Sequence, residues 1–149
     1  MRSLCVTTSC PTWSAPMTGD TILASTARYV SPGDERRNEM NKLSLDATAR
    51  EQLERARVES SGRSSTTVFG GHEYVLRQVV VALTEGSSMA EHNSPGEATI
   101  IVLSGRVRLS AGTTTWEGRK GDLLVVPLQR HSLEAIEDAV IVLTVAKAG

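Results

Sequence analysis

The sequence predicts an all-β barrel or sandwich over residues 63–149, preceded by one amphipathic helix within residues 40–62. After Gly62, short runs rich in β-branched residues alternate with turn residues, and the hydrophobic period becomes 2. The even spacing of these runs is typical of sandwiches and barrels. Several runs are apolar on both parities, which indicates that something covers the outer face of the sheet.

The first 39 residues precede the patterned part of the chain. Residues 1–39 are rich in Ser, Thr, Pro and Gly and have no hydrophobic period, so we expect a disordered extension. Met40 opens the first patterned segment, and we hypothesise that native translation starts there. Both cysteines, Cys5 and Cys10, lie in the extension, where no histidine accompanies them to complete a zinc site.

One helix is predicted between the extension and the strands. Ser44 is a suitable N-cap, and apolar residues follow at spacings of three and four, at Leu45, Ala49, Leu53 and Ala56. Gly62 ends the segment, as glycine commonly does after a helix C-terminus. This helix can cover part of the sheet, and we expect a second subunit to cover the rest, which predicts a homodimer.

About eight strands are predicted from the period-2 runs. They are STTVF, EYVLRQVVVALT, EATIIVLS, RVRLSAG, TTTWE, DLLVVP, SLEAIE and AVIVLTVA.

Composition excludes several classes of function. The net charge is −1 and the chain has one Phe, two Trp and two Tyr, so neither a basic field nor a base-stacking platform supports direct nucleic-acid binding. No run of apolar residues is long enough for a membrane span, and the N-terminus is a poor secretory signal. We therefore expect a soluble, cytoplasmic protein.

Two motifs carry a resemblance to a known family. In the first, Gly86, His92 and Gly105 stand at the glycine, histidine and glycine positions of the first cupin motif, with Ser94 in place of its second histidine and Ala98 in place of its glutamate.

The second motif covers GDLLVVPLQRH, where Gly121, Pro127 and His131 match and Gln129 replaces a glycine. From about Gly70 to Ala146, the chain resembles short single-domain bacterial cupins. The resemblance implies an RmlC-like jelly roll, or double-stranded β-helix.

The resemblance also implies a site for a divalent metal such as Mn, Fe, Zn or Ni. Of the family's ligands, His92 and His131 remain. Glu97 is the nearest carboxylate, but it has the wrong parity to face the cavity unless Pro95-Gly96 forms a bulge. Two imidazoles fall short of the three protein ligands that catalytic metal sites generally have.

Two other polar residues are candidates for the pocket wall. Ser94 offers a hydroxyl, and Gln78 shares a strand face with Val80 and Ala82, which we expect to point inward. His72 is expected in a solvated loop.

Charged residues near the turns have simpler explanations. Arg106 and Arg108 share one strand face. We expect them to be either ordinary exposed charges or an anion-binding site. Glu134, Glu137 and Asp138 are expected to form a solvated face.

Three functions stay open. The first is a small-molecule-binding cupin with a degenerate metal site, whose ligand contacts His92, His131, Ser94 and Gln78. The second is a metal-dependent isomerase, epimerase or dioxygenase, which the fold alone supports weakly. The third is a sensor module that acts through a partner.

Overall fold

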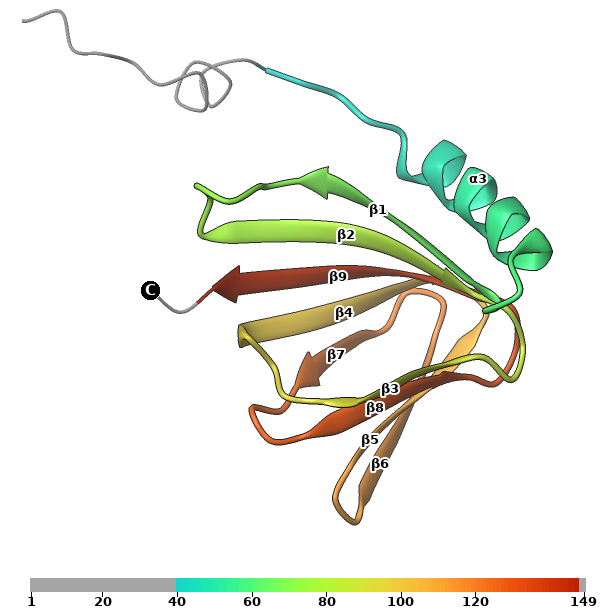
Figure 1. Cartoon of the computed structure of the whole chain (residues 1–149), viewed down its shortest axis with the longest axis vertical. Helices are drawn as coiled ribbons and strands as arrows, with labels where there is room; N and C mark the ends of the chain where they lie inside the picture. Colours follow the sequence, from blue (N-terminus) through green and yellow to red (C-terminus); the bar gives the residue numbers. More distant parts are fainter. Residues whose placement is uncertain (1–39, 148–149) are drawn as a thin grey trace, which may run out of the picture. The chain divides into compact units, whose positions relative to one another are not determined.

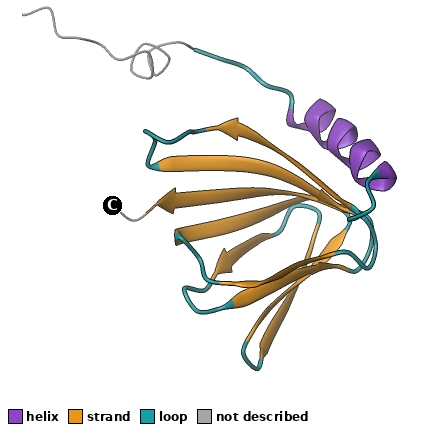
Figure 2. Ribbon diagram, in the orientation of Figure 1, coloured by secondary structure: helices purple, strands orange, loops and turns teal. Residues whose placement is uncertain are grey.

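The computed structural model describes residues 40–147, and the expected N-terminal extension lies outside this range. Within these residues, one helix is followed by nine strands (Figure 1, Figure 2). The elements are α3 (Leu45–Val58), β1 (Arg63–Phe69), β2 (Leu76–Leu83), β3 (Ser88–His92), β4 (Gly96–Ser104), β5 (Arg106–Ala111), β6 (Thr114–Arg119), β7 (Leu123–Val126), β8 (His131–Ala135) and β9 (Ala139–Lys147).

The strands form two antiparallel sheets that enclose the main core. One sheet has the order β1-β2-β9-β4-β7 and the other the order β3-β8-β5-β6. Leu83, Val107 and Ile141 lie between the sheets and are all 0% exposed. This jelly-roll arrangement with one preceding helix confirms the predicted fold class.

The strand β3 was missing from the sequence prediction. Its residues, SMAEH, contain one large apolar side chain, and the strand pairs with β8 along one edge alone, with a register shift between Met89 and His92. Backbone pairing with β8 holds this segment extended without an apolar pattern, so a search for period-2 runs could not find it.

The helix begins as expected. Ser44 Oγ accepts a hydrogen bond from the Ala47 N–H at 3.3 Å. The helix ends at Val58, and Gly62 follows in a turn with a φ of 66°, a value that favours glycine. No helix within residues 40–147 is long and apolar enough to cross a membrane.

The helix α3 covers one part of the outer face of the five-stranded sheet. Ala56 packs against a second cluster of buried residues from β2 and β9, namely Val80, Ala82, Val140 and Val142. The even-numbered residues of β2 therefore face the helix, and the odd-numbered residues face the other sheet. This arrangement explains why these strands are apolar on both parities.

The β4–β7 part of the same outer face is not covered by α3. Ile101, Leu123 and Val125 are 38%, 56% and 72% exposed there. Ile101 lies opposite Leu123 in the β4–β7 register. The homodimer that we expected to cover this surface stays a prediction.

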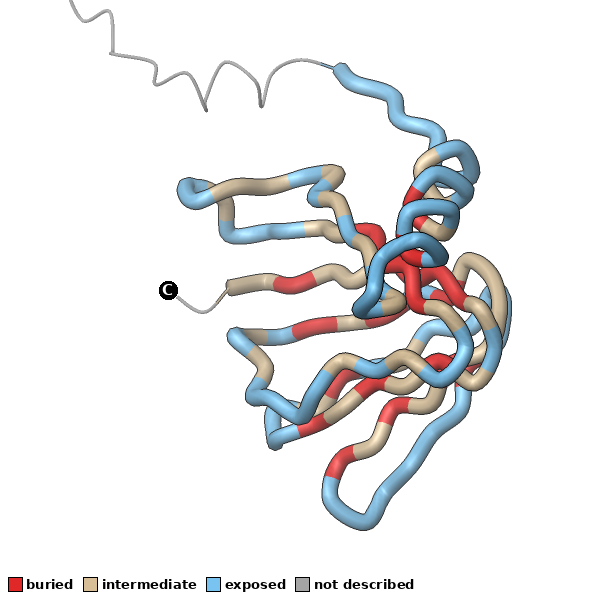
Figure 3. Tube along the Cα trace, turned by 45° about the vertical axis from the view of Figure 1, so that its right-hand side comes forward, coloured by how far each residue is buried: buried red, intermediate tan, exposed pale blue. Residues whose placement is uncertain are grey.

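The two ends of the sandwich differ in burial. We call the end with Leu83, Gly105 and Ala139 the closed end, and the end with Arg77 and Lys147 the open end. At the closed end, Leu83 lies opposite Ala139, and both are 0% exposed. Figure 3 shows one group of buried segments beside α3 and shorter buried segments along the strands of both sheets, while much of the strand ends opposite α3 is exposed or half-buried.

Candidate ligand-binding pocket

A pocket of about 720 Å³ lies between the two sheets. Alternate residues of the central strands form its apolar floor, because side chains at i and i+2 on a strand share a face. These residues are Val79, Val81, Ile100, Ile141, Leu143 and Val145. The pocket wall also includes His92, Ser94 and His131, three residues that the sequence placed there.

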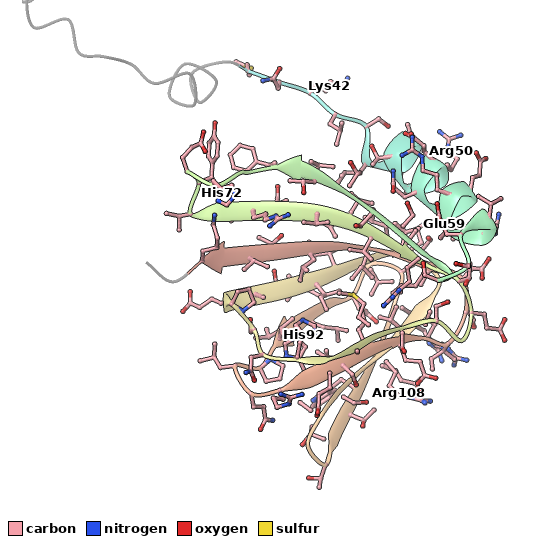
Figure 4. All side chains as sticks on the ribbon, in the orientation of Figure 1. Lys42, Arg50, Glu59, His72, His92 and Arg108 are labelled. Carbon is pink, nitrogen blue, oxygen red and sulfur yellow. The ribbon has the colours of Figure 1, made fainter. Side chains whose placement is uncertain are left out.

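The two pocket histidines lie side by side. His92 on β3 is opposite His131 on β8, and their ring centroids are 4.7 Å apart with planes tilted by 57° (Figure 4 labels His92). His131 is 6% exposed, whereas His92 is exposed. The first and second motifs, about 40 residues apart in sequence, therefore meet through one strand pair.

Backbone carbonyl groups orient both imidazole rings. His92 Nδ1 lies 2.8 Å from Ala90 O, and His131 Nδ1 lies 3.0 Å from Gln129 O. A carbonyl oxygen can only accept a hydrogen bond, so each Nδ1 carries a proton and donates it. In the tautomer with its proton on Nδ1, each ring has its Nε2 left to accept a hydrogen bond from a ligand or to bind a metal.

The other donors do not complete a catalytic metal site. Ser94 Oγ donates to the carbonyl of Gly96, and Ala98 lines the pocket where the family motif has a carboxylate. Glu97 is exposed and does not line the pocket, because its neighbour Ala98 takes the inward position on β4. Residues 40–147 contain no group of three or more His, Cys, Asp or Glu that could hold a metal ion. Two imidazoles alone do not fit a centre that needs about three protein ligands.

The expected inward orientation of Gln78 is wrong. Gln78 lies on the outer face of β2, where its Nε2 donates to Thr144 Oγ1 at 3.2 Å. The sequence could not reveal this orientation, since α3 makes the outer face of β2 as apolar as the inner face. Arg77 and Val79 take the inward positions instead.

Three basic residues of the pocket wall were not foreseen. Arg63, Arg77 and Lys147 line the pocket at the ends of β1, β2 and β9. Arg63 Nη1 donates to Ser88 O at 2.8 Å, and Arg77 Nη2 donates to Thr67 Oγ1 at 3.4 Å. Lys147 Nζ donates to Gly71 O at 2.8 Å and to the backbone oxygen of the loop residue His72 at 3.2 Å. Arg77 and Lys147 stand two residues from Val79 and Val145, so their place in the pocket wall follows only once the inner parity of β2 and β9 is known.

The arginines on the outer face of the four-stranded sheet are neutralised by carboxylates. Arg108, labelled in Figure 4, is 2.9 Å from Glu117 and 3.5 Å from Glu134. Arg106 is 3.5 Å from Glu137 and 3.8 Å from Glu117. The hydrogen bond from Arg108 lowers the pKa of the Glu117 carboxyl and raises the pKa of Arg108. These arginines share one face, as expected, and form surface ion pairs instead of an open anion site.

Asp138 is more than a solvated turn residue. Its Oδ1 accepts the Glu85 N–H at 2.9 Å, and its Oδ2 accepts Arg57 Nη2 at 2.9 Å. The backbone hydrogen bond from Glu85, followed by the side-chain hydrogen bond from Arg57, lowers the pKa of Asp138. Asp138 thereby connects the C-terminal turn of α3 to the closed end.

Comparisons with known proteins identify the fold. No family model matches the chain, and no curated protein matches it. Among solved structures, a conserved protein of unknown function from Streptococcus pyogenes is 26% identical with a TM-score of 0.60, over 83% of this chain and 98% of that one.

Two further structures are named as cupins. A Cupin 2 conserved barrel domain protein from Salinispora arenicola is 19% identical with a TM-score of 0.55, over 74% of this chain and 92% of that one. A cupin superfamily protein from Desulfitobacterium hafniense is 14% identical with a TM-score of 0.54, over 58% of this chain and 78% of that one. Likenesses at these identities establish the fold and carry no activity with them.

Proposed function

Because the chain has the cupin fold, we propose that it binds a small organic molecule in the pocket between its sheets, without a catalytic metal centre. The pocket volume of about 720 Å³ carries this proposal, since small-molecule sites typically occupy ~300–1,000 Å³. An apolar floor with a few polar groups at the wall is also typical of such sites.

The histidine pair supplies the directional contacts. Because each Nδ1 donates its proton to a backbone carbonyl, each imidazole in this tautomer offers its Nε2 as an acceptor for a ligand hydroxyl or amide. His131 is the more buried of the two, so a hydrogen bond to its Nε2 would be better shielded from water than one to His92.

A thermal-shift screen of the full chain against a metabolite library, with and without a chelator, tests this function. We expect at least one organic compound to raise the Tm equally under both conditions. At a hundred times its Kd, a ligand stabilises a protein by about 2.7 kcal/mol. His131→Ala should weaken this shift, and the matched control His72→Ala should not. Absence of any stabilising compound, or a shift that the chelator abolishes, contradicts the proposal.

The competing candidate is a metal-dependent enzyme of the isomerase, epimerase or dioxygenase type. The Nε2 atoms of His92 and His131, which could both bind a metal ion, favour this candidate. The lack of a third protein ligand within residues 40–147 argues against it. Elemental analysis after metal-replete growth separates the two functions. About one ion per chain would contradict our proposal, whereas fewer than about one ion per ten chains would contradict the enzyme.

A further inference from the structure

We infer that the pocket takes an amphiphilic organic carboxylate, whose charged group binds at Arg77 and Lys147 and whose apolar body lies on the floor formed by β2, β4 and β9. This inference rests on the proposed function, because it names the class of molecule that the same pocket binds.

The sign of the pocket's charge is the first argument. The charged residues that line the pocket are Arg63, Arg77 and Lys147, and neither Asp nor Glu is among the lining residues. The chain as a whole has 17 acidic and 16 basic residues. The numbers of acidic and basic residues in the chain are therefore nearly equal, whereas the charged residues that line the pocket are all basic. A cavity walled by cations attracts anions.

The partners of these cations are the second argument. On the outer surface, Arg106 and Arg108 contact carboxylates, as described above. Among residues 40–147, Arg77 and Lys147 form no ion pair, and their polar contacts are with a hydroxyl and with backbone carbonyls. Arginine has five N–H donors and lysine three, so both retain donors for a ligand. The carboxylate that would neutralise them is not supplied by the described part of the chain.

Strand register brings the two cations together. Arg77 on β2 lies opposite Val145 on β9, and Lys147 is two residues further along β9 on the same face. Such diagonal neighbours in an antiparallel pair have Cα atoms about 7–8 Å apart, within reach of long side chains. One carboxylate can thus accept hydrogen bonds from both, and it would also relieve the repulsion between two neighbouring cations.

The floor of the pocket selects an organic anion over an inorganic one. Ile100 and Val145 are 3% and 7% exposed, and the half-buried Val79 and Leu143 adjoin them. An inorganic phosphate at Arg77 and Lys147 would leave this apolar floor in contact with water. A carboxylate with an apolar body would cover it, which adds the hydrophobic contribution to the ionic one.

The test uses matched pairs of probes on the full chain. A panel of linear, branched and aryl carboxylic acids, which includes octanoate and phenylacetate, is measured by thermal shift and calorimetry beside the primary amide of each acid and beside inorganic phosphate. We expect several acids to bind more tightly than their amides, and this preference to weaken as salt is added.

Variants locate the charge. Arg77→Gln and Lys147→Gln should each weaken binding of the preferred acid by about 10- to 100-fold, the range expected for a lost charge-assisted hydrogen bond. Arg119→Gln is the matched control, because Arg119 is an exposed strand arginine that does not line the pocket. Circular dichroism of each variant verifies folding, and Arg77→Lys should recover part of the affinity.

The outcomes separate this inference from the proposed function. If amides and acids bind equally, the pocket binds small molecules but does not select anions, and the inference is overturned. A preference for phosphate over every acid, or equal losses in Arg77→Gln and Arg119→Gln, overturns it as well. If neither this panel nor the metabolite library contains a ligand, the proposed function fails together with the inference.

Discussion

The closed and open ends of the sandwich are built from the same strands with different side chains. At the closed end, β2 and β9 present Leu83 and Ala139, both 0% exposed. At the open end, the inner faces of these strands present Arg77 and Lys147 beside the pocket. The contrast teaches that stability and binding are separated along individual strands, so a substitution should affect one or the other according to its end.

The largest expected effect is at the closed end. Leu83→Ala should lower the free energy of unfolding by about 2–5 kcal/mol, because it leaves a cavity in a closely packed core. The same substitution at Leu143, which is half-buried and lines the pocket, should lower it by less than about half of that amount. Urea denaturation of both variants measures the difference, and equal losses would contradict the comparison of the two ends.

A glycine at the closed end should come next. Gly105 has a φ of 74°, and a Cβ there would lie 2.0 Å from Asp138 O. Gly105→Ala therefore adds a backbone clash to the strain of a left-handed residue, and we expect a loss of more than about 2 kcal/mol. Gly112 is the control, since it has a φ of 58° and nothing within 4 Å of a Cβ. If Gly112→Ala is as unstable as Gly105→Ala, the close approach to Asp138 has no effect.

Asp138→Asn should have a smaller and pH-dependent effect. The pKa of Asp138 is lower in the folded chain, so its stabilisation is present above the ordinary value of 3.8 and is lost as the pH falls through the lowered pKa. Arg57 and Asp138 are 55% and 36% exposed, so solvent screening limits the loss to about 1 kcal/mol at neutral pH. The free energies of unfolding of the variant and the parent should therefore begin to converge as the pH falls below 3.8, and denaturation curves measured from about pH 7 downward follow this change. If the difference in free energy of unfolding between the variant and the parent stays constant with pH, the ionised carboxylate of Asp138 is not the source of the stabilisation.

The smallest effect on stability is expected at the open end. Arg77→Gln should change the free energy of unfolding by less than about 0.5 kcal/mol, because Arg77 is exposed and its one hydrogen bond, to Thr67, is long. Thermal denaturation without ligand measures this change. A loss comparable to that of Leu83→Ala would mean that the open end also supports the core.

The sequence predicted the fold through its turn residues. Gly86, Gly105 and Gly121 all have positive φ values, of 80°, 74° and 92°. Few residues other than glycine adopt this conformation, so the glycines of the motifs mark the turns of the fold. The spacing of the same motifs placed His92 and His131 at one pocket. Their binding roles, like that of Ser94, stay predictions.

The orientation of residues on β2 could not be predicted from the pattern. A run such as VVVAL reads the same in either orientation, so Gln78 was placed inward and Arg77 was overlooked. The position of α3 decides which parity faces outward, and that position depends on contacts between segments distant in sequence. Basic residues that line the pocket, such as Arg77, can therefore be identified only when it is known which face of β2 points inward.

The hydrogen bond from Arg63 to Ser88 has a further consequence. Among the described residues it is the one hydrogen bond that joins β1 to β3, and the two sheets share no backbone ladder along this side. From this point the two strands diverge (Figure 1). Along this seam the two sheets are therefore joined by a side chain and not by a strand pair, so loss of the Arg63 guanidinium would leave every strand pair of both sheets intact.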